Sequence, residues 1–212
     1  MLRKWLLGIV GGLLASTFAH ASSYQAGVQY DVVADHATSK AEVREFFSFY
    51  CPHCFHFEPL VLNLEASLPK GVTLEKNHVD FLRQAPASVQ MMLAQAYVTG
   101  RDMGQGHEVA KIIFEYIHKD RANFNSYDDI RSLMAVSGID MTKFEQKFNS
   151  MPVIAAANYM KDQQTLWSEK QVLTGVPTLI VNGKYRVNLA KLDSNNLAND
   201  LNQLVAFLLT NP

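Results

Sequence analysis

The chain contains two cysteines, and they stand three positions apart in the sequence Cys51-Pro52-His53-Cys54. Two thiols at this spacing can form a disulfide with each other, or they can supply half of the ligands of a zinc site. A bridge between them would close so short a loop that it would restrict the unfolded chain very little, which makes it a poor structural crosslink. A zinc site would need two further ligands from His53, His56, His78 or carboxylates, because the chain has no other cysteine. The pair therefore favours reversible thiol–disulfide exchange, with metal binding as the alternative. Apart from that alternative, we assign His56 and His78 no chemical role.

The residues around Cys51 predict that it lies where a strand passes into a helix. Residues 43–50 (VREFFSFY) are rich in aromatic side chains and end at the Cys-Pro step, which is typical of a buried strand. Pro52 fits the first position of the helix that follows, since its missing N–H would have no partner there. The Cys51 sulfur would then face the unpaired N–H groups of the helix and the positive end of its dipole. This position favours the thiolate over the thiol.

His53 lies between the two sulfurs and is a candidate to tune their chemistry. A positive charge or an N–H donor at this position would lower the pKa of Cys51 further. Pro52 is a second candidate because it sets the start of the helix. Cys54 follows one turn later, and we expect it to be the more buried thiol. Because a stable thiolate favours the reduced form, the disulfide should be oxidising, and a substrate thiolate would attack Cys51 and expel Cys54.

One carboxylate, Glu45, stands among the aromatic residues of the predicted strand, six residues before Cys51. A charge in such a run should be buried or paired. We expect its partner to be Lys76 on the next strand, and Glu58 in the intervening helix can reach the same region. Two roles remain open for this group: a structural ion pair, or proton transfer to or from Cys54.

The elements at the two ends of the chain predict a small α/β domain. Residues 72–81 have strand character, so strand, helix and strand form a βαβ unit with a right-handed crossover. Residues 178–187 give a β-hairpin signal around Asn182-Gly183, and an amphipathic helix over residues 197–208 follows. Gly175-Val176-Pro177 precedes the hairpin, where a proline at a strand entrance is allowed.

The middle of the chain changes to a helical period. Apolar residues recur at helical spacing between residues 84 and 171, with a capping box beginning at Ser126 and a further helix cap at Asp140. We therefore predict an α/β domain made of residues 22–83 and 172–212. Residues 84–171 would form an inserted helical domain and its connecting helix.

The first 21 residues have the features of a cleaved secretory signal peptide. Arg3 and Lys4 precede an apolar run over residues 5–14, and the small-residue site Ala19-His20-Ala21 follows. The run is shorter than the roughly 20 residues that a membrane anchor needs. Cleavage after Ala21 would leave 191 residues with a net charge of −3, which gives nucleic acids no electrostatic attraction. We expect the mature protein to be soluble and to work in the bacterial periplasm, where disulfides persist.

The segment from Glu45 to Cys54, followed by Phe57 and Glu58, resembles the active-site segment of the DsbA family of thioredoxin-fold oxidases. Later family segments are similar to His78-Val79-Asp80-Phe81, Asn149-Ser150, Gly175-Val176-Pro177 and Val181-Asn182-Gly183-Lys184-Tyr185. The resemblance covers essentially the whole mature chain. It implies a thioredoxin-like fold, with the βαβ unit, the hairpin and the last helix as its parts and an all-helical domain inserted between them.

The resemblance also implies a role for each matching residue of the site. Cys51 would be the nucleophile, Cys54 the resolving thiol and His53 the tuning residue. Pro177 would be cis and face the disulfide, and Val176 would offer its backbone to a bound peptide.

The family's buried charged cluster is matched by Glu45, Glu58 and Lys76. No cofactor would be needed beyond the redox-active disulfide itself, and no metal. The partners that the resemblance implies are reduced or unfolded exported proteins and a DsbB-type inner-membrane oxidase that restores the disulfide.

Two other functions compete with a disulfide oxidase. A disulfide isomerase or reductase is the nearest, but related periplasmic isomerases resemble dimers with a separate N-terminal dimerisation domain. Only about 20 residues lie between Ser22 and the active-site strand, too few for such a domain, so we expect a monomer. The alternative from another class is a metal-binding or peptide-binding module with an inert Cys-x-x-Cys.

Overall fold

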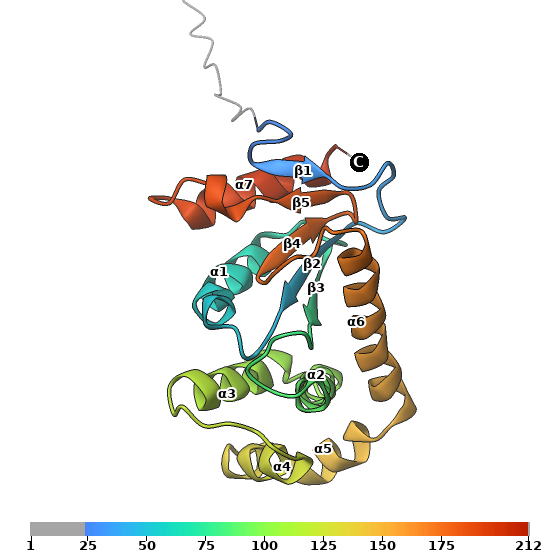
Figure 1. The fold of residues 1–212 in the computed structure, drawn as a ribbon, viewed down its shortest axis with the longest axis vertical. Coiled ribbons are helices and arrows are strands. Elements are labelled where there is room, and N and C mark those ends of the chain that lie inside the picture. Colours follow the sequence, from blue (N-terminus) through green and yellow to red (C-terminus); the bar gives the residue numbers. More distant parts are fainter. Residues whose placement is uncertain (1–23, 212) are drawn as a thin grey trace, which may run out of the picture.

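The computed structural model describes residues 24–211, and the predicted leader, with Arg3, Lys4 and the cleavage site after Ala21, lies outside the described residues. A five-stranded sheet in the order β1-β5-β4-β2-β3 forms the centre of the fold (Figure 1). Its strands are β1 Tyr30–Val32, β2 Glu42–Phe47, β3 Thr73–His78, β4 Thr178–Val181 and β5 Tyr185–Val187. Among residues 24–211, no helix is both long and apolar enough to cross a membrane.

The predicted βαβ unit is present. Strands β2 and β3 run parallel, and α1 (Pro52–Ser67) connects them. Strand β2 is shorter than predicted because the chain turns after Phe47, where the Cys51 N–H donates to the Ser48 carbonyl at 3.0 Å. Residues 48–51 therefore form a turn between the strand and the helix, and this turn carries the first cysteine.

The helical block follows β3. It contains five helices, which are α2 (Ala87–Asp102), α3 (Gly106–His118), α4 (Tyr127–Val136), α5 (Met141–Phe148) and α6 (Met151–Glu169). The predicted caps are present, since Ser126 forms a capping box with Asp129 and the Asp140 side chain accepts from the Lys143 N–H. Helices α2 to α5 lie beyond the end of β2 and β3, and the long α6 runs back beside the sheet (Figure 1).

The chain returns to the sheet through the predicted hairpin. Asn182 and Gly183 both have positive φ, 52° and 60°, and the Lys184 N–H donates to the Val181 carbonyl at 3.0 Å. Strand β5 then pairs with β1, which the sequence analysis did not predict. The final helix, α7 (Leu197–Leu209), packs with α1 against one face of the sheet, and Trp167 of α6 packs against the other.

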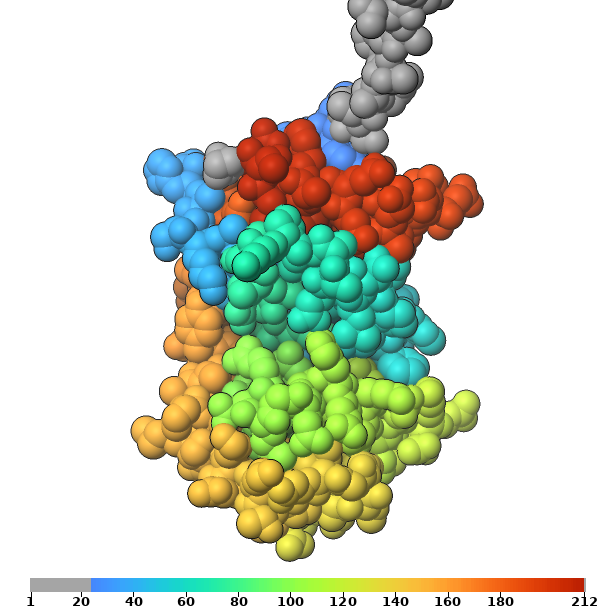
Figure 2. All heavy atoms as spheres, turned by 180° about the vertical axis from the view of Figure 1, so that it is seen from behind, coloured from blue at the N-terminus to red at the C-terminus, as the bar shows by residue number. Residues whose placement is uncertain are grey.

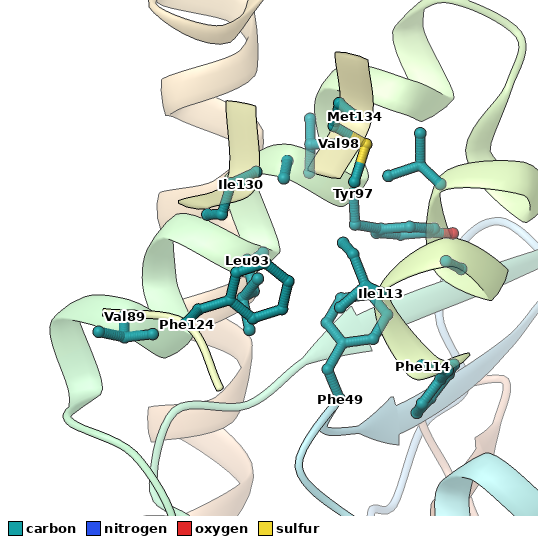
Figure 3. Packing of buried hydrophobic residues seen from close by; sticks show 14 of the residues in the cluster. Phe49, Val89, Leu93, Tyr97, Val98, Ile113, Phe114, Phe124, Ile130 and Met134 are labelled. Carbon is teal, nitrogen blue, oxygen red and sulfur yellow. The ribbon is translucent and has the colours of Figure 1, made fainter. Parts of the chain in front are cut away.

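The largest hydrophobic cluster joins the insertion to the active-site end of the sheet. Phe49 and the two cysteines belong to the same cluster as Leu93 of α2 and Phe114 of α3, and Figure 3 shows Phe49 beside Phe114. In the space-filling view the green helices of the insertion lie directly against the cyan helix α1 (Figure 2). The surroundings of the cysteines are therefore built by both parts of the chain.

Candidate active site

Cys51 is the N-cap of α1, as its position before Pro52 predicts. Its backbone is extended, with φ −92° and ψ 112°, and its Sγ accepts a hydrogen bond from the Cys54 N–H at 3.1 Å. Pro52 occupies the first turn of the helix and is exposed. Both cysteines are free thiols, so the site is in its reduced form with one sulfur at the helix N-terminus.

The two thiols hold their protons very differently. The pKa of Cys51 is lowered to about 7, mainly because the Cys54 thiol donates a hydrogen bond to its sulfur. Burial opposes this shift, the N–H groups of Cys54 and His53 support it, and the charge of Glu45 opposes it. The pKa of Cys54 is raised, first by burial and then by its hydrogen bond to Cys51. Cys51 is therefore the thiol that ionises near neutral pH, and Cys54 keeps its proton.

The exposure of the two sulfurs follows the predicted order, although the difference is small. Cys51 is 4% exposed and Cys54 is fully buried. The Val176 carbonyl lies 3.5 Å from the Cys51 sulfur, and the Val176–Pro177 peptide bond is cis, as the resemblance implies. The loop before β4 thus covers one side of Cys51.

His53 is exposed, and its contribution to the lowered pKa of Cys51 comes from its main-chain N–H. The amide belongs to the helix N-terminus and would be present with any residue except proline at this position. The tuning role of the imidazole therefore stays a prediction.

The predicted charged cluster assembles behind the cysteines. Glu45 and Lys76 are opposite each other in the β2–β3 pairing, with Lys76 Nζ 3.2 Å from a Glu45 carboxylate oxygen, and Lys76 also pairs with Glu58. Burial raises the pKa of Glu45 to about 7, Lys76 opposes this and Glu58 adds to it. Burial alone would lower the pKa of Lys76, but the two carboxylates raise it. Glu45 can therefore gain or lose a proton near neutral pH, and its charge acts on both thiols.

Two histidines that the sequence analysis left without a role contact the turn before Cys51. His78 Nε2 accepts from the Phe49 N–H at 3.1 Å, and His118 Nε2 lies 2.8 Å from the Phe49 carbonyl oxygen. His118 is 69 residues from Phe49 in sequence, so no local pattern could have revealed this contact. Among residues 24–211, no three His, Cys, Asp or Glu side chains are grouped closely enough to hold a metal ion.

The comparisons with known proteins agree with this geometry. A family model described as a DSBA-like thioredoxin domain matches residues 42–202. The thiol:disulfide interchange protein DsbA of Haemophilus influenzae is 34% identical over 206 residues, which is 96% of this chain and 96% of that protein.

Solved structures give the same result. DsbA from Klebsiella pneumoniae is 30% identical with a TM-score of 0.76, over 90% of this chain and 100% of that one. Proteus mirabilis DsbA in complex with the non-covalently bound peptide PWATCDS is 25% identical with a TM-score of 0.76, over 89% of this chain and 100% of that one. The chain therefore belongs to the DsbA-like thioredoxin domain family and is a thiol:disulfide oxidoreductase, with Cys51 and Cys54 as its Cys-x-x-Cys pair.

Proposed function

We propose that this protein donates the Cys51–Cys54 disulfide to newly exported proteins in the bacterial periplasm. The observation that carries the proposal is the difference between the two thiols, since Cys51 has its pKa lowered to about 7 and Cys54 has its pKa raised. Ordinary cysteine thiols have a pKa of about 8.5, so the lower pKa makes Cys51 the better leaving group in a mixed disulfide, and its more stable thiolate favours the reduced protein. Disulfides should therefore pass from this protein to its substrates.

The reaction consists of two exchanges at sulfur. A substrate thiolate attacks Cys51 Sγ, the Cys51–Cys54 bond breaks, and Cys54 leaves with the electron pair and takes up a proton. A second substrate thiolate then attacks the substrate sulfur of the mixed disulfide and expels Cys51 as a thiolate. The substrate has lost two electrons and gained a disulfide, and the protein has gained the two electrons as one thiolate and one thiol.

The charged cluster is suited to the proton transfer in this sequence. Cys54 must gain a proton when it leaves and lose one when the disulfide is restored, and it is fully buried. Glu45 is a nearby group whose pKa burial raises to about 7, and Lys76 lowers this pKa while Glu58 raises it. We therefore assign Glu45 to proton exchange with Cys54, and Lys76 and Glu58 to holding it.

The loop at Val176 and Pro177 is suited to binding the substrate beside Cys51. The Val176 carbonyl lies 3.5 Å from the Cys51 sulfur, so a peptide whose backbone paired with this loop would present its own cysteine at the correct place. The bound peptide of the Proteus mirabilis complex contains one cysteine, which supports a peptide as the ligand.

The remaining parts of the proposal concern the cell. The leader would be removed after Ala21, the mature protein would act as a monomer, and a DsbB-type inner-membrane oxidase would restore its disulfide. No cofactor other than this disulfide is required. Amino-terminal sequencing of the periplasmic protein and reoxidation by isolated membranes would test these points.

The central test uses a reduced, unfolded two-cysteine substrate and the oxidised protein in equal amounts. We expect one substrate disulfide for each protein disulfide lost. Cys54→Ala, incubated instead with the disulfide form of the same substrate, should accumulate a mixed disulfide, because the Cys51 thiolate opens the substrate disulfide and no Cys54 thiol is present to release the substrate. Cys51→Ala is the matched control and should form no adduct. An oxidised protein that leaves the substrate reduced, or a Cys54→Ala variant that traps nothing, would contradict the proposal.

A further inference from the structure

The turn that carries Cys51 is held by one of its own side chains, Ser48, and by side chains of β3 and α3. Inside the turn, the Cys51 N–H donates to the Ser48 carbonyl, and the Tyr50 N–H donates to the Ser48 hydroxyl at 3.2 Å. The two polar groups of Phe49 point away from the turn and meet His78 and His118. Every main-chain polar group of Phe49 is thus bonded to a histidine.

Geometry fixes the proton positions on these two rings. An N–H group can only donate, so His78 Nε2 must accept from Phe49 and any proton of the neutral ring must be on Nδ1. A carbonyl oxygen can only accept, so His118 Nε2 must carry a proton and donate to Phe49. The two histidines therefore hold the same residue with opposite tautomers.

The environment keeps each ring in its role. His78 is 3% exposed and stacks on the Phe49 ring at 5.1 Å. Burial lowers the pKa of His78 to about 3, with only Asp80 opposing, so its Nε2 stays free to accept. His118 stacks on Phe55 with the ring centres 5.1 Å apart and the planes 13° from parallel. Its Nε2 can donate whether or not the ring takes up a second proton.

We propose that His78 and His118 are positioning residues, which clamp the Phe49 peptide and thereby hold the Cys51 sulfur against the N–H groups of α1. The Cys51 thiolate depends first on the hydrogen bond from the Cys54 thiol and then on the N–H groups of Cys54 and His53, and such hydrogen bonds weaken steeply when distance or angle changes. The orientation of Cys51 is set by the turn that precedes it. His118 belongs to α3, so the helical insertion contributes to the reactivity of the thiolate through this contact.

The proposal deepens the disulfide-donor function and rests on it, and its test needs no substrate. In His118→Phe the ring can still stack on Phe55, but nothing donates to the Phe49 carbonyl, which is buried and costly to leave unpaired. We expect the pKa of Cys51 to rise by about half a unit to one unit, a roughly threefold to tenfold smaller thiolate-to-thiol ratio at a given pH below it. His118→Gln keeps an N–H donor and should restore a value close to wild type.

The matched control is His107→Phe, the same substitution at an exposed position of the same helix. Thiolate absorbance in the ultraviolet measures the Cys51 pKa in each variant. An unchanged pKa in His118→Phe, or a shift in His118→Gln as large as that in His118→Phe, would overturn the proposal.

A second measurement on the wild-type protein holds even if a variant fails to fold. Nitrogen-15 spectra of the histidine rings should show His78 protonated only at Nδ1 and His118 protonated at Nε2. His78 protonated at Nε2 would rule out the clamp. Failure to oxidise a substrate would be a separate result, since neither the ring tautomers nor the Cys51 pKa depends on which protein receives the disulfide.

Discussion

The pKa values of Cys51 and Cys54 differ because only Cys51 lies where hydrogen-bond donors of the protein stabilise a negative charge. The Cys51 sulfur accepts the Cys54 N–H and thiol hydrogen bonds at the start of α1. Cys54 lies inside the first turn of the helix, fully buried, where burial raises its pKa. The direction of disulfide transfer thus follows from a difference of one helical turn in the positions of two identical side chains.

Selective alkylation should show this difference directly. In the reduced protein, brief treatment with iodoacetamide should label Cys51 and leave Cys54 unlabelled until the protein is unfolded. The rate should rise as the pH is raised through about 7, the pKa of Cys51, and level off above it, because only the thiolate reacts. Mass spectrometry of the labelled peptides measures both results, and Cys51→Ser is the control. Equal labelling of both thiols in the folded protein would be inconsistent with this site.

Replacing His53 separates its imidazole from its amide. His53→Ala removes the exposed ring but keeps the N–H that lowers the pKa of Cys51. We expect the pKa of Cys51 to rise part of the way toward that of an ordinary cysteine. The reduction potential should fall by about 30 mV for each pKa unit of stabilisation below ambient pH that is lost, which makes the protein a weaker oxidant. Thiolate absorbance and equilibration with glutathione measure the two quantities, with His56→Ala as the control. Wild-type values in both would mean that the helix amides alone stabilise the thiolate.

Glu45 offers a test between its two possible roles. Glu45→Gln removes a group that can exchange a proton near pH 7, so disulfide exchange should slow by about tenfold or more. The free energy of unfolding should change little, because Lys76 keeps its ion pair with Glu58 and burial of the Glu45 charge is itself unfavourable. Glutathione exchange kinetics and denaturant unfolding measure these effects, with Glu42→Gln on the same strand as the control. Unaltered kinetics with a large loss of stability would identify a structural ion pair instead.

At the scale of the elements, the β4–β5 hairpin depends on a backbone conformation that suits glycine. Gly183 has a φ of +60°, and a Cβ atom there would lie 2.7 Å from Thr38 Cγ2. Gly183→Ala should therefore lower the free energy of unfolding by about 1–3 kcal/mol, through the left-handed conformation and the contact together. Denaturant unfolding measures the loss. The double variant with Thr38→Ala should recover only the part of this loss that comes from the contact with Thr38. An unchanged free energy of unfolding in Gly183→Ala would contradict the prediction.

Local patterns were sufficient to predict most elements around the site. The strand before Cys51, the helix after it and the hairpin at Asn182-Gly183 each have signals within a few residues, so the sequence predicts them. Strand β1 was missed because its three residues, Tyr30–Val32, are too few to give a strand signal by themselves, and pairing with β5 orders them. The end of β2 was placed three residues too late, since aromatic residues in the turn resemble those of a strand.

The residues of the site also differ in whether local patterns could predict them. Cys51, Cys54 and the Glu45–Lys76 pair could be predicted because they lie on adjacent elements of one βαβ unit. The contact of His118 with Phe49 could not, since it depends on how the insertion docks on the sheet. A single histidine at the end of an amphipathic helix has no feature that distinguishes it from an ordinary surface residue.

At the scale of the whole molecule, the inserted helices and the sheet share one hydrophobic cluster around the active site. Phe114 of α3 is 1% exposed and packs edge-on against Phe49, with the ring centres 4.9 Å apart. Trp167 of α6 packs on the other face of the sheet, beside Phe46 and Ile180. The insertion therefore contacts the turn after β2 and, separately, one face of the sheet, and neither part could lose its partner without exposing buried aromatic rings.

This arrangement predicts that the mature protein unfolds in a single transition. Far-ultraviolet circular dichroism reports mainly the helices, and Trp167, the only tryptophan after the predicted leader, reports the sheet side by fluorescence. We expect the two signals to change together, and Phe114→Ala to shift both to lower denaturant by a loss of about 3–5 kcal/mol. Val136→Ala on the surface of α4, where the side chain is 84% exposed, is the control and should change stability by less than about 0.5 kcal/mol. Loss of the helical signal before the fluorescence signal would contradict this prediction. It would mean that the insertion unfolds independently of the sheet.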